Sequence, residues 1–285
     1  MFFVVGAVSQ YIGAAVGVFL FTTADPAAVA WLRAAAAAAV LLAWRRPWRL
    51  RWTRRGVAVA GGFGVVTVGM NVAFFEAIAR IPLGTAVAIE FLGPIAVATL
   101  GSRRARDVLA VAMVAAGVAL LAGAPGGGAG RPAGDDALGI VFALVAAGMW
   151  AGYILLSKRV ADAGSGLDSL AVGMAVAAVV LALPLLARQV LDDASVLAEP
   201  RTWLLGLGVG VLSTAVPYVL DQFVLTVISR ARFALLLALL PATAAVVGVV
   251  MLHQLPTVAE VAGIALVMAA LVISAGGQEA APGPP

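Results

Sequence analysis

Long apolar runs, separated by short charged or glycine- and proline-rich breaks, extend along the whole chain. A helix needs about 20 consecutive apolar residues to cross the hydrocarbon core of a bilayer. The pattern therefore predicts an all-α polytopic membrane protein. Its ten transmembrane helices are expected at 2–22, 27–44, 56–79, 84–101, 106–123, 137–157, 169–187, 202–228, 231–252 and 257–275.

The composition supports this interpretation and narrows the chemistry. Hydrophobic residues make up 63% and charged residues 11% of the 285 residues, whereas charged residues make up about a quarter of a soluble domain. Little chain remains for a soluble catalytic domain. The chain has no cysteine and one histidine, which excludes thiol catalysis, disulfides and multi-histidine metal clusters. We therefore predict no enzyme, no cofactor and no metal site.

Basic residues concentrate in alternate loops. If ten helices are present, the even-numbered loops hold 13 of the 18 lysines and arginines and the odd-numbered loops hold 4. Cytoplasmic loops are rich in these residues, so the bias predicts that both termini are cytoplasmic. The net charge of +4 then reports orientation rather than binding to nucleic acid. For the arginine-rich loop 45–55, an additional role in binding a partner or anionic lipid stays open.

The chain also contains an internal repeat. Residues 84–101 resemble residues 231–248, with Pro94 and Pro241 in register at an offset of 147, and residues 107–123 match 260–276 in length. Five helices per half is an odd number, so the second half enters the membrane in the opposite sense. Inverted repeats of this kind are typical of alternating-access transporters. Chance similarity between alanine-rich helices is the alternative. The predicted domains are repeats at 1–123 and 137–276, a flexible periplasmic linker at 124–136 and a disordered tail at 277–285.

Ionisable side chains inside a membrane are costly and mark candidate functional sites. At a rise of 1.5 Å per residue, Arg33 and Glu90 both lie about 9 Å below the outer helix ends, and Asn71 lies at roughly 13 Å. Arg33 is the candidate counter-ion of Glu90, and a purely structural pair is the alternative. Glu76 can pair with Arg80 four residues later, so its simplest role is an ion pair at the outer rim.

A second polar group is expected nearer the cytoplasmic side. Asp221 lies about 10 Å from the inner end of its helix, and Tyr218 shares its face. Pro217 leaves the carbonyl of Ser213 without its helical donor, a break that is tolerated where the freed group lines protein or water. A proton or an amine could then move between Glu90 and Asp221. The alternative places Asp221 at the cytoplasmic rim.

Further polar residues are predicted near mid-depth. These are Gln10 and Tyr11 in the first helix and Trp150 and Tyr153 in the sixth. Trp150 and Tyr153 share a helix face, and packing is a more frequent role for such a pair than substrate binding. Three small-residue spacings predict close helix contacts, namely Gly13 with Gly17, Gly148 with Gly152, and Gly206 with Gly210. His253 is expected to be a solvated cap.

Several blocks resemble a known family. They are RRPWRL at 45–50, GMN at 69–71, IPLGTAVAIEFLGPIAVATLGSRR at 81–104, MWAGYIL at 149–155 and LSTAVPY at 212–218. Together they resemble the threonine/homoserine exporters of the EamA type, within the drug/metabolite transporter superfamily. The resemblance implies ten helices in two inverted repeats, a bacterial inner-membrane location and proton-driven efflux of small amino acids. It also implies a central cavity formed mainly by helices 1–4 and 6–9, with helices 5 and 10 peripheral.

By position, the resemblance assigns family polar or aromatic positions to Glu90, Asn71, Tyr218, Asp221 and Trp150. The chain departs from the family at Leu240, where a glutamate often precedes the proline, at His253-Gln254 and at Val18. These departures leave the substrate and the coupling ion open.

We therefore predict a secondary active, proton-coupled exporter of small amino acids such as threonine and homoserine. In this hypothesis Glu90 and Asp221 carry the amine or the proton, Arg33 faces a carboxylate or neutralises Glu90, and Asn71 and Tyr218 supply hydrogen bonds. The expected partners are a small-molecule substrate, protons and membrane lipids, with the chain as a monomer or homodimer. The alternatives are an exporter of purines, neutral compounds or drugs on the same fold, and a membrane scaffold without transport.

Overall fold

The computed structural model describes residues 2–99, 104–123, 134–162, 166–217, 220, 224 and 235–279. Every regular element among these residues is a helix. In order they are α1 (Phe2–Leu20), α2 (Pro26–Arg45), η1 (Pro47–Arg49), α3 (Arg54–Ile78), α4 (Leu83–Glu90), α5 (Leu92–Thr99), α6 (Ala105–Gly123), α7 (Asp135–Asp162), α8 (Gly166–Val180), α9 (Ala182–Asp193), α10 (Ser195–Ala198), α11 (Pro200–Gly210), η2 (Val211–Ala215), α14 (Leu240–Leu252) and α15 (Val258–Glu279).

The described helices include six that are long and apolar enough to cross a membrane, or seven if the bent pair α8 and α9 forms one span. The pair bends by 43° at Leu181. The multi-pass, all-helical class is therefore confirmed. The count of ten and the cytoplasmic termini stay predictions, because the predicted helix at 202–228 passes into residues outside the described part. The linker residues 124–133 and the tail residues 280–285 lie outside it as well.

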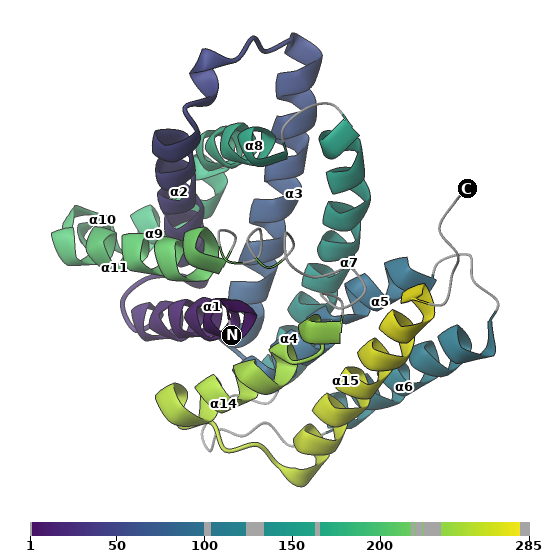
Figure 1. Ribbon diagram of the computed structural model, residues 1–285. Coiled ribbons are helices and arrows are strands. Elements are labelled where there is room, and N and C mark those ends of the chain that lie inside the picture. The colour runs from purple at the N-terminus through teal and green to yellow at the C-terminus, as the bar shows by residue number, and fades with distance from the viewer. Residues whose placement is uncertain are drawn as a thin grey trace.

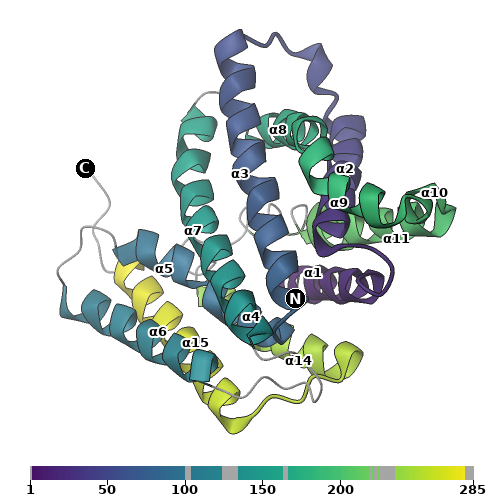
Figure 2. The same ribbon diagram turned by 180° about the vertical axis from the view of Figure 1, so that it is seen from behind.

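α3 runs from the top of the molecule toward its centre in both views (Figures 1 and 2), and it contacts α1, α2, α4, α7 and α8. α3 contacts α7 on one side and α8 on the other, and α2 packs against α8 and α11. α6 and α15 lie side by side at an edge of the molecule. The helices that the resemblance implies to be peripheral are thus each other's main neighbours.

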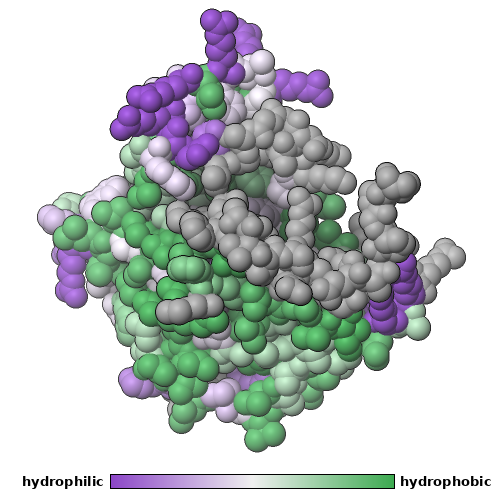
Figure 3. All heavy atoms as spheres, in the orientation of Figure 1, coloured by the Kyte–Doolittle hydropathy of each residue, from purple (hydrophilic) through white to green (hydrophobic). Residues whose placement is uncertain are grey.

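The face in Figure 3 has a largely apolar body and a strongly polar end. Figure 3 shows hydrophobic residues over most of the visible face and hydrophilic ones gathered over the connection between α2 and α3. Large apolar side chains such as Leu183, Leu191 and Val250 are exposed on the helices. A surface of this kind fits lipid rather than water.

Two helices break shortly before the prolines that the predicted repeat places in register. α4 ends at Glu90 and α5 begins at Leu92, because Pro94 has no N–H for the Glu90 carbonyl. The helix that leads into α14 likewise has a turn at Ala238 and Leu239, shortly before Pro241. The turns at Phe91 and Ala238 differ by the same 147 positions as the two prolines.

Small residues allow two of the predicted close contacts. Gly206 and Gly210 of α11 face Leu32 and Ala36 of α2, and a β-carbon at either glycine would lie within 3 Å of those side chains. The prediction for this spacing is confirmed. Gly13 and Gly17 are also confirmed, since a β-carbon at each would meet η2 or α3.

The third spacing was predicted wrongly. A β-carbon at Gly148 would meet nothing within 4 Å among the described residues, and one at Gly152 would make only an ordinary contact with Val66. The sequence spacing alone does not show which face of α7 meets a neighbour.

The tightest crossing gives a stability prediction. A β-carbon on Gly64 would overlap the backbone carbonyl of Gly173, where α3 crosses α8. Gly64→Ala should therefore destabilise the protein by about 3 kcal/mol, because the obstacle is backbone and cannot rotate away. Gly62→Ala, on the same helix with open space around it, should be neutral or slightly stabilising. Thermal unfolding of the two variants in detergent measures the difference, and equal melting temperatures would contradict the crossing.

Candidate functional site

A cavity of about 350 Å³ lies among the helices on both sides of α3. Its volume is in the range of small-molecule sites. Its polar wall consists of Gln10, Arg33, Thr67, Asn71, Ser213 and Thr214, and its aromatic wall of Trp150 and Tyr153. The remaining lining residues are apolar: Met70, Pro94, Ile154, Leu170, Met174, Pro217, Leu237 and Leu240. Five residues of the predicted site, namely Gln10, Arg33, Asn71, Trp150 and Tyr153, therefore line one cavity.

Arg33 brings a positive charge to this cavity from the middle of α2. It is only 8% exposed. Its Nε donates to Thr214 Oγ1 at 3.2 Å, and its Nη2 donates to the carbonyl of Ser213 at 3.1 Å. This is the carbonyl that Pro217 deprives of a helical donor. The freed group predicted from the sequence is thus satisfied by Arg33.

α3 contributes two further polar residues to the wall. Thr67 and Asn71 are one turn apart and both buried. Thr67 Oγ1 donates to the carbonyl of Phe63, and Asn71 Nδ2 donates to the carbonyl of Thr67 at 2.8 Å. Asn71 Oδ1 makes no hydrogen bond to another described residue, so it can accept one from a molecule in the cavity.

The two aromatic residues line the cavity and also pack against other rings. Trp150 meets Phe91 edge to face at 4.8 Å between centroids, and Tyr153 stacks on Phe63 at 4.8 Å. These contacts hold both rings in place. The packing role and a place in the cavity wall are therefore compatible.

Glu90 and Tyr11 lie beside this cavity rather than among its lining residues. Glu90, the last residue of α4, is 9% exposed, and Tyr11 is 3% exposed. Neither a hydrogen bond nor an ion pair joins the Glu90 carboxylate to another described residue. Among the described residues, Arg33 and Glu90 do not form an ion pair with each other. The two side chains nevertheless lie close enough to interact electrostatically with each other and with the Tyr11 hydroxyl.

Glu76 forms the ion pair predicted for it. Its carboxylate accepts a hydrogen bond from Arg80 Nη1, and the Arg80 guanidinium lies 5.0 Å from the centroid of Phe142. Tyr218 and Asp221 lie outside the described residues, so the inner polar group stays a prediction.

Three polar side chains of the cavity wall, those of Thr67, Ser213 and Thr214, were not among the predicted site residues. A signal was present for each of them. Thr67 precedes Asn71 by four residues, which is one helical turn, and the two hydroxyl residues precede Pro217 by four and three. Small hydroxyl residues near a proline break mark places where irregular backbone faces a cavity.

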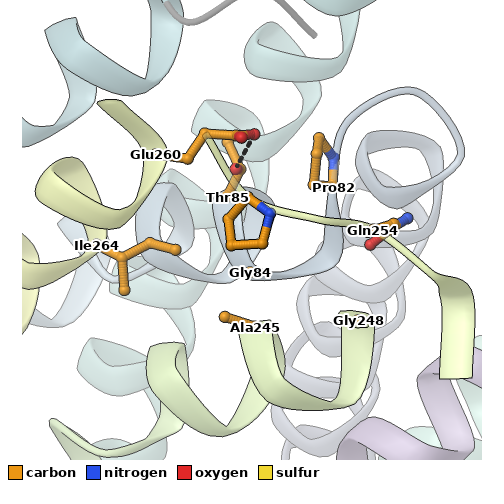
Figure 4. Close-up of a pocket in the computed structure, with 9 residues that line it drawn as sticks. Pro82, Gly84, Thr85, Ala245, Gly248, Gln254, Glu260 and Ile264 are labelled. Atoms are coloured by element: carbon orange, nitrogen blue, oxygen red, sulfur yellow. Dashed lines mark hydrogen bonds between the residues drawn. The ribbon is translucent and has the colours of Figure 1, made fainter. Parts of the chain in front are cut away.

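A second, much smaller pocket lies where α4, α14 and α15 meet (Figure 4). It holds about 10 Å³, which is the space of one water molecule. Glu260 Oε1 accepts a hydrogen bond from Thr85 at 3.1 Å, while Oε2 accepts one from the backbone N–H of Thr257. Thr257 and Glu260 thus form a capping box at the start of α15.

The same junction accounts for the departure at His253-Gln254. Gln254 Oε1 accepts a hydrogen bond from the Leu83 N–H at 2.9 Å and so caps α4. His253 is exposed and ends α14 in the left-handed conformation, as expected of a solvated cap. The pocket is a structural junction between helices. No group of three potential metal ligands occurs within the described ranges.

Comparison with known proteins gives consistent results. The EamA-like transporter family profile matches residues 137–276. The threonine/homoserine exporter RhtA of Salmonella typhimurium is 35% identical over 263 residues, covering 90% of this chain and 84% of the relative. RhtA of Escherichia coli K12 is 34% identical over 268 residues, with the same coverage.

A solved crystal structure shares the fold, with a TM-score of 0.58 and 21% identity over 95% of this chain and 94% of the other. With the apolar spans and the long similarity to the exporters, the chain is a multi-pass membrane protein that belongs to the EamA-like transporter family.

Proposed function

We propose that this protein exports threonine, homoserine and similar small amino acids across the bacterial inner membrane by proton-coupled alternating access. The observation that carries the proposal is the identity of about 35% to threonine/homoserine exporters over 90% of the chain. As a transporter it would catalyse no covalent step.

The cavity supports an amino-acid substrate. A free amino acid carries a carboxylate and an ammonium group. Arg33 supplies a cation at the wall, and guanidinium groups match carboxylates in geometry and charge. Asn71 Oδ1 and the Gln10 side chain supply acceptors for the ammonium group. Trp150 and Tyr153 close the apolar side, so a short side chain would meet aromatic carbon.

The repeat supports alternating access. The family profile covers 137–276, the bounds of the second predicted repeat. The proline breaks at Pro94 and Pro241 occur in register. Pro94 and Leu240, the residue before Pro241, line the cavity. Broken helices that meet at a central site are typical of transporters built from inverted repeats.

Glu90 supports proton coupling. A carboxyl group buried in the membrane without an ion-pair partner among the described residues is costly as a charge and stable as an acid. Its electrostatic interaction with Arg33 links its charge to the cavity. Proton binding at Glu90 and carboxylate binding at Arg33 would therefore influence each other, which is the basis of coupled transport. Asp221 would provide the inner counterpart.

Competition in proteoliposomes tests the substrate class. Purified protein should take up labelled threonine when an imposed pH gradient drives it, and unlabelled homoserine should compete. A purine or a neutral drug should not. Competition by a purine but not by homoserine would overturn the amino-acid proposal in favour of another metabolite on the same fold. That the protein is a monomer or a homodimer stays a prediction. Light scattering of the same preparation measures its oligomeric state.

A further inference from the structure

Two side-chain hydrogen bonds join the π-helical turn η2 to other helices, one to α1 and one to α2. In this turn the Val216 N–H bonds to the carbonyl of Val211, five residues back. Pro217 has no N–H. It therefore cannot serve the Leu212 carbonyl five residues before it, nor the Ser213 carbonyl four residues before it.

Side chains from two other helices satisfy both freed carbonyls. Ser9 Oγ of α1 donates to the Leu212 carbonyl at 2.9 Å, and Arg33 Nη2 of α2 donates to the Ser213 carbonyl at 3.1 Å. A buried carbonyl left without a donor costs free energy. The conformation of the turn therefore depends on the positions of α1 and α2.

The turn also forms part of the cavity wall through Ser213 and Thr214. Ser213 Oγ is buried and has no hydrogen-bond partner among the described residues. It faces Gly13 of α1, where a β-carbon would overlap it. The contact between α1 and the turn is thus close, but it leaves one hydroxyl unsatisfied in this conformation. π-Turns are frequent at functional sites.

We propose that η2 is a hinge of the transport cycle and that Ser9 is a positioning residue that holds the hinge in the conformation described. The proposal rests on the alternating-access part of the proposed function. When α1 moves away from the turn, the Leu212 carbonyl loses its donor, so the Ser9 hydrogen bond favours this conformation over the one that opens on the opposite side.

Cysteine labelling can measure this equilibrium, because the chain has no cysteine of its own. A single cysteine at Ile154, which lines the cavity, is labelled with a membrane-impermeant maleimide from each side of oriented vesicles. Ser9→Ala removes the donor. In Ser9→Ala the ratio of the two labelling rates should change by about tenfold, in favour of the side from which the cysteine is labelled more slowly when Ser9 is present. A change of about tenfold is the scale of one hydrogen bond to a buried carbonyl.

Two further variants separate the hinge from a general loss of structure. Ser9→Thr keeps a hydroxyl and should restore the original ratio. Ser157→Ala removes a hydroxyl that bonds within α7, to the carbonyl of Ile154, and should leave the ratio unchanged. An unchanged ratio in Ser9→Ala overturns the hinge, even if threonine transport is robust. If the labelling ratio shifts but the protein does not transport threonine, the hinge proposal stands and the proposed substrate is wrong.

An independent observation points to a lipid surface on the α2–α3 connection. Residues 46–55 contain five exposed arginines, and the chain has no acidic residue between Asp25 and Glu76. Arg45 is bound to Asp168 by two hydrogen bonds, at 2.9 and 3.1 Å. No ion pair joins the other five, Arg46, Arg49, Arg51, Arg54 and Arg55, to another described residue.

The connection is folded and carries exposed aromatic residues. η1 spans Pro47–Arg49, and Trp52 Nε1 donates to the Pro47 carbonyl at 2.9 Å. Trp44 is 52% and Trp48 is 65% exposed. Tryptophan favours the membrane interface, and clustered arginines beside a span attract anionic headgroups. We infer that this surface binds anionic phospholipid headgroups of the adjacent leaflet.

Thermal unfolding in detergent tests the lipid surface with phosphatidylglycerol as the probe and phosphatidylcholine as the neutral comparison. Phosphatidylglycerol should raise the melting temperature of the unmodified protein by several degrees, and 0.5 M salt should reduce the effect. The variant with Arg49, Arg51, Arg54 and Arg55 changed to glutamine should lose it. A control with Arg188→Gln and Arg201→Gln should keep it. Equal lipid-induced shifts of the melting temperature in the two variants would contradict the proposal that this surface binds anionic headgroups.

Discussion

Replacing Glu90 by glutamine is expected to abolish proton-driven threonine transport while the protein still folds. Glutamine has nearly the same shape but cannot release a proton. The rate driven by a pH gradient should fall by about 100-fold or more, the scale on which loss of a proton-transfer group acts. Threonine exchange without a gradient should be affected less. Fluorescence from a pH indicator inside the vesicles and uptake of labelled threonine measure the two processes together.

Glu76→Gln is the matched control for this result. It makes the same chemical change in the same part of the chain, but Glu76 already pairs with Arg80 beside the Phe142 ring. We expect its transport rate to stay within about threefold of the unmodified protein, since exposed or rim ion pairs contribute little. If both variants transport equally well, Glu90 has no part in coupling.

The second large effect is expected at Arg33. Arg33→Gln removes the cation from the cavity wall and both hydrogen bonds to η2. Threonine uptake at low concentration should fall by about 10- to 100-fold, because hydrogen bonds from charged groups contribute more than neutral ones. Arg33→Lys keeps the charge but not the planar fork, so it should recover only part of the loss.

A competitor without a carboxylate separates the two roles of Arg33. Threoninol has the amine and the hydroxyl of threonine but no carboxylate. If Arg33 binds the substrate carboxylate, the variant should lose affinity for threonine and not for threoninol. Arg188→Gln, at an exposed surface position, should change neither. Equal losses of affinity for threonine and threoninol would mean that Arg33 supports the η2 turn and does not bind the substrate carboxylate.

Parts of this fold could be predicted because they depend on local rules. The apolar runs predicted a multi-pass helical protein, of which six or seven spans lie in the described residues, and the four-residue spacing predicted the Glu76–Arg80 pair. Pro217 gave the freed Ser213 carbonyl, since a missing N–H is a property of the residue itself. The break before Pro94 follows from the same rule, but the prediction of one continuous helix at 84–101 missed it.

Other parts depend on which face of each helix meets its neighbours. Depth placed Arg33 and Glu90 in one layer, but depth does not determine direction around the helix axis. In the structure Arg33 bonds to η2, and Glu90 is buried but is not among the residues that line the cavity. Gly148 and Gly152 were misread for the same reason, since their face of α7 makes no close helix contact among the described residues. The donor from Ser9 to Leu212 joins residues 203 positions apart, so no local pattern could reveal it.

We propose that the cavity carries a small amino acid across the membrane in exchange for protons. Uptake of labelled threonine into proteoliposomes under an imposed pH gradient, measured together with internal pH, is the decisive experiment. We expect threonine movement that follows the imposed pH gradient, moves protons in the opposite direction and disappears in Glu90→Gln. Threonine movement without any proton movement, or proton-coupled movement of a purine that threonine does not inhibit, would contradict it.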